Sequence, residues 1–110
     1  MFKYHHHKKR GSAVNTFTID KKTYSIRLTD HAQLRLQQRN IDLFQVIGSI
    51  LSLGENRITE YQNTNRDIFI MDKQNNFSIV FTIEQNTIYI ITVIDSADCY
   101  IKSGTIAVNL

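Results

Sequence analysis

The chain has 110 residues, 42% of them hydrophobic, so it is long enough for one domain with a core of modest size. No segment approaches the roughly 20 apolar residues that cross a bilayer. No apolar stretch follows Met1 either, so we expect neither a membrane protein nor a secreted one. The one cysteine, Cys99, cannot form an internal disulfide, and this favours a cytoplasmic location.

The net charge of +3 comes from the first residues. Residues 1–12 hold four of the thirteen basic residues and none of the ten acidic ones, which leaves residues 13–110 near −1. A strongly basic body would indicate binding along nucleic-acid phosphates. Any nucleic-acid site on this body must therefore be a local cluster.

We interpret residues 1–12 (MFKYHHHKKRGS) as a disordered tail or tag remnant, and residues 13–110 as a single domain. A metal or phosphate arm at residues 5–7 is the alternative for this stretch. Consecutive histidines cannot all face one metal from a regular element, and the sequence has no spaced second cluster. We therefore expect no metal site and no cofactor.

Residues 16–28 alternate between apolar and polar side chains around a polar turn at 20–22, which predicts a β-hairpin. Tyr24, Ile26 and Leu28 share one face of its second strand.

Two helices are predicted next. Thr29 and Asp30 are typical of a helix start, because a short oxygen-bearing side chain accepts from the free first-turn N–H groups. The first helix is expected over residues 31–39 and the second over residues 42–53, with Gly54 where a glycine ends a helix. The join is so short that the helices must be spatial neighbours. The stripe expected to face the core on the second helix consists of Leu43, Ile47, Ile50 and Leu51.

The remaining segments predict strands at residues 57–62, 66–72, 77–84 and 87–95, with residues 105–108 as an edge strand or docked tail. Short connections between the later strands require antiparallel neighbours. The sequence thus predicts an α+β fold: an N-terminal hairpin or strand, then a two-helix pair packed on an antiparallel sheet of about four strands. The residues expected in the core beneath Ile47 and Leu51 are Ile79, Phe81, Ile90 and Val93.

The candidate functional residues are His31, Arg35 and Arg39, spaced four residues apart on the first predicted helix. Each is turned about 40° from the last, so the three form one stripe. Arginine presents a planar fork that suits phosphate, and histidine can exchange a proton near neutral pH. Such a stripe suits RNA strand cleavage, with a proton acceptor or donor beside cations that stabilise the charge on the phosphate.

A purely structural role is the alternative. His31 lies in the first turn of its helix, where it could cap or pack. Arg35 and Arg39 could form salt bridges, for which the candidate partners are Asp42, Glu55, Glu60 and Asp67.

Residues 29–95 resemble a family of small proteins and toxin tips whose opening helix reads H-A-x-x-R-x-x-x-R-x-I, here His31, Ala32, Arg35, Arg39 and Ile41. That family is similar to the RelE/ParE-like toxin superfamily. The resemblance implies two helices on an antiparallel sheet, with His31, Arg35 and Arg39 as catalytic residues and, by position, Arg66 and Thr92 as substrate-binding residues. It implies a metal-independent endoribonuclease toxin that cleaves RNA by 2′-hydroxyl attack, with a cognate antitoxin or immunity protein as partner.

The alternative function is a non-catalytic protein-interaction module on the same fold, such as a phage-encoded inhibitor or an immunity partner. Its working surface would be the sheet edge and Leu34, which lies on the helix face away from the core stripe.

Overall fold

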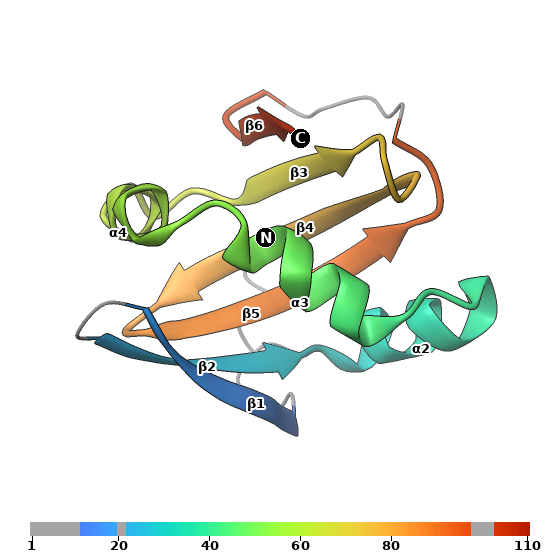
Figure 1. The fold of residues 1–110 in the computed structure, drawn as a ribbon, viewed down its shortest axis with the longest axis horizontal. Helices are drawn as coiled ribbons and strands as arrows, with labels where there is room; N and C mark the ends of the chain where they lie inside the picture. The colour runs from blue at the N-terminus through green and yellow to red at the C-terminus, as the bar shows by residue number, and fades with distance from the viewer. Residues whose placement is uncertain (1–11, 20–21, 98–102) are drawn as a thin grey trace.

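Helices and strands follow one another in blocks, as expected for an α+β protein (Figure 1). The computed structural model describes residues 12–19, 22–97 and 103–110, and side chains within these ranges from residue 22 onward. The predicted tail lies outside the described residues except for Ser12, which opens the first strand. The elements are β1 (Ser12–Ile19), β2 (Lys22–Leu28), α2 (Asp30–Arg39), α3 (Leu43–Leu51), α4 (Glu55–Gln62), β3 (Ile68–Asp72), β4 (Phe77–Glu84), β5 (Thr87–Ile94) and β6 (Ile106–Asn109).

The described strands form one six-stranded sheet in the order β1-β2-β5-β4-β3-β6. The predicted hairpin and the antiparallel pairs β3–β4 and β4–β5 are present. The sheet is mixed, however, because β2 pairs with β5 and β3 pairs with β6 in parallel. Only strands joined by tight turns must be antiparallel neighbours. Long stretches of chain separate β2 from β5 and β3 from β6, so the direction of those pairs was open. The prediction of an antiparallel sheet of about four strands is therefore wrong on both points.

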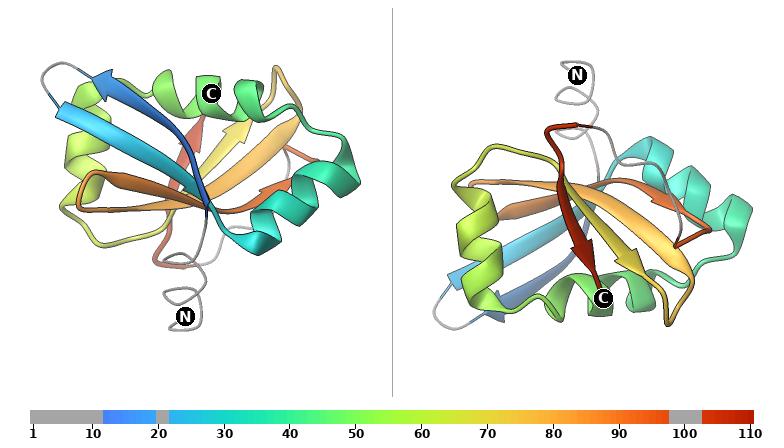
Figure 2. Two further views of the ribbon diagram at one scale, coloured as in Figure 1. Left: turned by 90° about the horizontal axis from the view of Figure 1, so that it is seen from below. Right: turned by 90° about the horizontal axis from the view of Figure 1, so that it is seen from above.

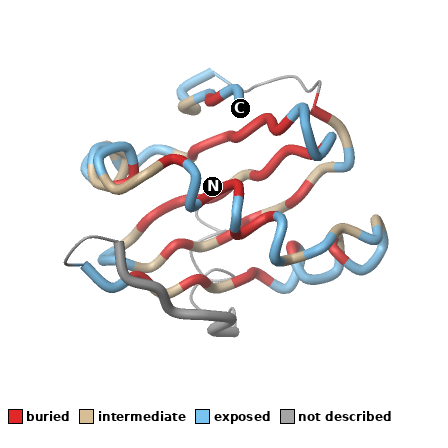
Figure 3. The backbone as a smooth tube through the Cα atoms, viewed as in Figure 1, coloured by how far each residue is buried: buried red, intermediate tan, exposed pale blue. Residues whose placement is uncertain are grey.

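One face of the sheet is covered by α3 and α4, and the views from below and above both show this layer (Figure 2). The main core lies between this layer and the sheet, where the central strands are buried along most of their length (Figure 3). The four predicted core residues of β4 and β5, Ile79, Phe81, Ile90 and Val93, are all fully buried. None of the helices in the described part of the chain is long and apolar enough to cross a bilayer.

The core stripe of α3 differs from the predicted one. Val46, Ile47 and Ile50 are buried, whereas Leu51 is 37% exposed. The helix ends at Leu51, and the buried Leu53 follows it from the next turn of the chain. Val46, Ile50 and Leu53 have a spacing that fits one helix face as well as the predicted stripe does. Only the position of the sheet decides which of these two stripes is buried.

The segment predicted as a strand at residues 57–62 is the helix α4. Its β-branched and aromatic residues favoured a strand, but β propensity depends strongly on context. Ile58 is fully buried and Tyr61 packs against the core cluster, a spacing of three residues that suits one helix face. Gly54, with φ of +84°, makes the turn from α3 into α4 in a region that favours glycine.

The helix α2 takes the place of a strand beside the second half of β5. The strand β2 pairs with β5 only as far as Leu28 and Ile90, and the chain then enters α2. The backbone N–H of Thr29 donates to Ile90 O at 3.1 Å, and its side chain donates to Ile91 O at 2.8 Å. The same hydroxyl oxygen accepts from the Ala32 N–H at 3.0 Å, so Thr29 is the predicted helix cap and also docks the helix on β5.

Replacing Thr29 with valine is expected to lower the free energy of unfolding by about 1–3 kcal/mol, because the buried hydroxyl is lost while the two backbone groups it joins remain. Thr29 is 1% exposed, so water cannot replace these bonds without opening the structure. Urea denaturation measures the change, and Thr29→Ser, which keeps the hydroxyl, is the matched control. Equal stability of Thr29→Val and the wild type would show that the cap contributes nothing.

Candidate functional site on helix α2

The three predicted catalytic residues occupy one stripe of α2, but they differ in how near they lie to the core. Ala32 and Leu36 are the buried residues of this helix. Each step from His31 to Arg35 to Arg39 turns the side chain about 40° toward that buried stripe. Accordingly His31 is exposed, whereas Arg35 and Arg39 are partly buried.

His31 and Arg35 contact each other. The Nε of Arg35 donates to Nε2 of His31 at 3.4 Å. This long bond requires an unprotonated Nε2, so the imidazole is in the neutral form that carries its proton on Nδ1. Thr29, and not His31, caps the helix, and His31 is exposed.

The guanidinium of Arg35 is oriented by Gln38, a residue that the sequence interpretation missed. Its Nη1 donates to Oε1 of Gln38 at 2.7 Å. Helix spacing alone could have indicated this contact, because residues three apart are neighbours on the surface of a helix. A guanidinium has five N–H donors, and these two contacts leave the Nη2 donors without a partner among the described residues.

Arg39 joins α2 to β5. Its Nη1 donates to the backbone oxygen of Val93 at 2.6 Å, and its Nε lies 3.8 Å from Oδ1 of Asp95. None of the acidic residues considered as partners from the sequence makes this contact. The carboxylate of Asp95 is 64% exposed, so the ion pair adds little, and the bond to the strand carbonyl is the stronger link. Thr29 and Arg39 thus anchor both ends of α2 to β5.

Of the two predicted substrate-binding residues, Arg66 lies away from α2, whereas Thr92 lies on β5, the strand beside α2. Arg66 precedes β3, which is separated from β5 by β4, and its Nε donates to Gly104 O at 2.7 Å. Thr92 pairs with Val80 and is partly exposed, next to the fully buried Val93. Within the described residues, no hydrogen bond or ion pair joins Arg66 or Thr92 to His31 or Arg35.

The electrostatics of α2 favour a neutral histidine. Partial desolvation of the imidazole, followed by the positive charges of Arg35 and Arg39, lowers the pKa of His31 from its ordinary value of 6.5. His31 is therefore neutral at pH 7 and able to accept a proton. In the part of the chain that the structure describes, no three histidine, cysteine, aspartate or glutamate residues gather as a metal site.

The lowered pKa of His31 predicts how the protein responds to acid. In the unfolded chain the pKa of His31 returns to 6.5, so below pH 6.5 the unfolded state binds more protons than the folded state. The free energy of unfolding should therefore fall as the pH drops from 6.5 through the lowered pKa of the folded protein.

Arg35→Gln removes one positive charge that repels the imidazolium, and it is expected to raise the pKa of His31. The measurement is an NMR titration of the imidazole Cε1–H, assigned by its loss in His31→Ala.

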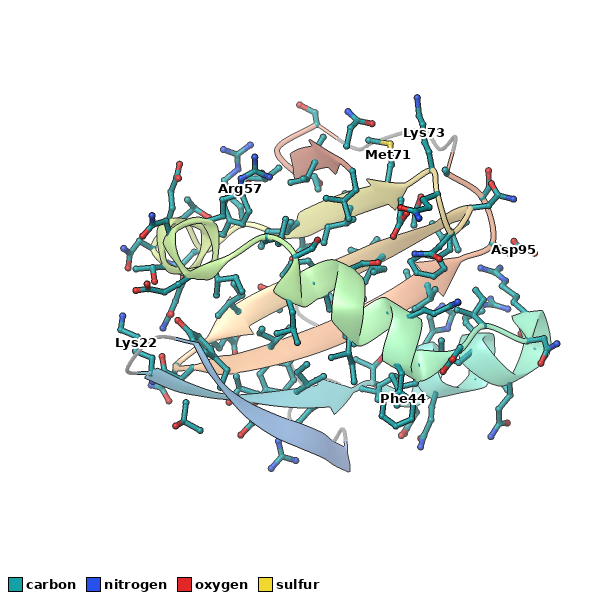
Figure 4. All side chains as sticks on the ribbon, viewed as in Figure 1. Lys22, Phe44, Arg57, Met71, Lys73 and Asp95 are labelled. Atoms are coloured by element: carbon teal, nitrogen blue, oxygen red, sulfur yellow. The ribbon has the colours of Figure 1, made fainter. Side chains whose placement is uncertain are left out.

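Arg57→Gln is the matched control for this titration. Arg57 is an exposed arginine of α4, at the opposite end of the molecule from α2 (Figure 4). The Arg57→Gln substitution removes the same charge from a site far from His31, so the pKa of His31 should stay at the wild-type value. An equal shift in both variants would show that the pKa responds to net charge and not to the contact on α2.

Comparison with known proteins gives a family but no characterised relative. Searches of curated proteins and of solved structures found no match. A family model described as a domain of unknown function, DUF4258, matches residues 28–95. The match covers α2 through β5 and includes all five predicted site residues. Since it spans more than half of the 110 residues, the chain belongs to the DUF4258 family.

Proposed function

We propose that this protein is a metal-independent endoribonuclease of toxin type with a RelE-like fold, and that His31 and Arg35 form its catalytic pair. The observation that carries the proposal is the exposed, neutral imidazole of His31 beside a guanidinium whose Nη2 donors have no described partner. The resemblance of residues 29–95 to a family that is similar to the RelE/ParE-like toxins supports the same assignment.

The proposed reaction needs only a base and a cation. His31 Nε2 removes the proton of a ribose 2′-hydroxyl, and the 2′-oxygen forms a bond to the adjacent phosphorus. The bond from phosphorus to the 5′-oxygen breaks, and that oxygen takes a proton from the imidazolium or from water. The products are a 2′,3′-cyclic phosphate and a free 5′-hydroxyl. The guanidinium of Arg35 stabilises the charge that develops on the phosphate oxygens.

Substrate must displace the bond between Arg35 and His31, which at 3.4 Å is weak enough to give way. Gln38 then keeps the guanidinium oriented through the 2.7 Å bond to Nη1. Arg39 acts here as a positioning residue, because its donation to Val93 O fixes the end of α2 on the sheet.

Arg35→Lys is expected to lower the cleavage rate about tenfold, the equivalent of roughly 1.4 kcal/mol for one charge-assisted hydrogen bond, because an ammonium cannot act as a planar fork. Initial rates on a fluorogenic RNA oligonucleotide measure this change. Arg57→Lys, an exchange of the same kind on α4, should leave the rate unchanged. Equal rates for Arg35→Lys and the wild type would remove Arg35 from the mechanism.

The deciding experiment incubates the purified protein with total RNA in EDTA and maps the ends of the products. Cleavage that leaves cyclic phosphate supports the proposal. Inducible expression in bacteria is the second measurement, since a cytoplasmic toxin should stop growth unless a cognate antitoxin or immunity protein is co-expressed. Absence of cleavage, together with unimpaired growth, would overturn it.

A non-catalytic interaction module is the second candidate, and exposed apolar side chains favour it. Leu34 of α2 is 48% exposed and Phe44 of α3 is 75% exposed, and large exposed apolar side chains are common at protein interfaces. On this interpretation wild type and His31→Ala would be equally harmless when expressed, whereas Leu34→Ala would weaken capture of the partner.

A further inference from the structure

A hollow of about 350 Å³ lies between α3 and the turn that joins β3 to β4. It is lined by Gln45, Gly48, Ser49 and Ser52 of α3, with Asp72 and Asn75 among the residues opposite them. A Cβ added at Gly48 would meet no atom within 4 Å, so the space in front of this residue is open. None of these residues belongs to the site on α2.

The carboxylate of Asp72 gives this hollow its charge. Asp72 is 4% exposed and accepts from neutral groups: Ser49 Oγ at 2.6 Å, Asn75 Nδ2 at 2.8 Å and the Asn75 N–H at 3.0 Å, together with the backbone N–H of Gln74. Burial alone would raise the pKa of Asp72, but these hydrogen bonds outweigh it and lower the pKa. The group is therefore ionised at neutral pH.

No cation of the described chain balances this charge. The neighbouring Lys73 points away from α3 (Figure 4), and Asp72 forms no ion pair with any described residue. An ionised carboxylate that lines an open hollow and is held by neutral donors is complementary to a positively charged group that enters from outside.

The other flank of α3 is apolar and exposed. At 100° per residue, Phe44 and Leu51 lie on one side of the outermost line of the helix, and the residues that line the hollow lie on the other. Phe44 is 75% exposed and Leu51 is 37% exposed. Gly48 lies between the two flanks, so a peptide backbone could cross the helix there at close range.

We infer that the hollow receives the arginine side chain of a partner polypeptide, which crosses α3 at Gly48 and packs an apolar residue against Phe44. A guanidinium carries the required charge, and it has further donors for the side-chain oxygens of Gln45 and Ser52. Asp72 is the one described lining residue with an ionisable side chain, and a single carboxylate side chain suits such an organic cation better than a metal ion. This inference does not depend on the proposed ribonuclease activity.

The test titrates two acetylated peptide amides, Leu-Arg and Leu-Ser-Arg, into the labelled protein and follows backbone amide signals by NMR. At least one peptide should shift the amides of Ser49, Ser52 and Asn75. Replacing its arginine with citrulline, which has nearly the same shape and no charge, should weaken binding about tenfold or more. Equal shifts from both forms, or none from either, would overturn the inference.

Variants distinguish the parts of the site. Asp72→Asn should abolish the preference for arginine over citrulline. Gly48→Leu should block the hollow while leaving Asp72 in place, and Gly48→Ala, its matched control, should still bind; this pair decides the matter if Asp72→Asn fails to fold. Phe44→Ala should weaken binding of the peptide but not of acetylarginine amide. No effect of Phe44→Ala on either ligand would overturn the assignment of a polypeptide partner.

Discussion

Replacing His31 with alanine is expected to lower the rate of RNA cleavage about 10²–10⁴-fold, the usual contribution of a general base. The imidazole is exposed and neutral, and its one described hydrogen bond is the 3.4 Å contact with Arg35. Removing it therefore takes away the proton acceptor without removing packing. The rate is measured on purified protein in EDTA with a defined RNA oligonucleotide.

Two controls separate proton transfer from loss of structure. Leu34→Ala changes an exposed side chain of the same helix, outside the stripe formed by His31 and Arg35, and should leave the rate unchanged. Added imidazole should partly restore the activity of His31→Ala, because a free base can occupy the vacated space, whereas it should not accelerate Arg35→Lys. A His31→Ala protein that cleaves at the wild-type rate would contradict the mechanism.

Replacing Phe81 with alanine is expected to lower the free energy of unfolding by about 3–5 kcal/mol, the range for a buried aromatic side chain. Phe81 is fully buried on β4, where it pairs with Ile68 of β3 and Ile90 of β5, which are also fully buried. The cost combines lost apolar burial with the cavity that remains. Denaturant unfolding, with the m-value compared between variants, measures it.

Phe44→Ala makes the same chemical change at a side chain that is 75% exposed, so it is the matched control. It should alter stability by less than about 0.5 kcal/mol, as most surface substitutions do. A cost below about 1 kcal/mol at Phe81 would show that the core does not close around β4, contrary to the burial observed.

Local patterns in the sequence determined much of the fold. The strands at residues 68–72, 77–84 and 87–94 lie within the predicted segments, because alternating or continuous apolar residues end at polar turns. Thr29 identified the start of α2 because capping is a local interaction: the side chain of the cap residue accepts from an N–H only three residues further along the chain. The stripe of His31 and Arg35 beside Ala32 and Leu36 follows from helix geometry alone.

Contacts between distant segments decided what local pattern left open. The segment at residues 55–62 is helical because Ile58 and Tyr61 reach the core only with helical spacing, and no local signal distinguished this from a strand. The parallel pairing of β2 with β5 depends on how a long connection returns to the sheet. The same pairing places α2 beside β5, and there the carbonyl of Val93, 54 residues away in the chain, engages Arg39. The sequence thus placed a histidine and two arginines on one helix face, but only the tertiary structure separated His31 and Arg35, which contact each other, from the arginine that anchors the helix.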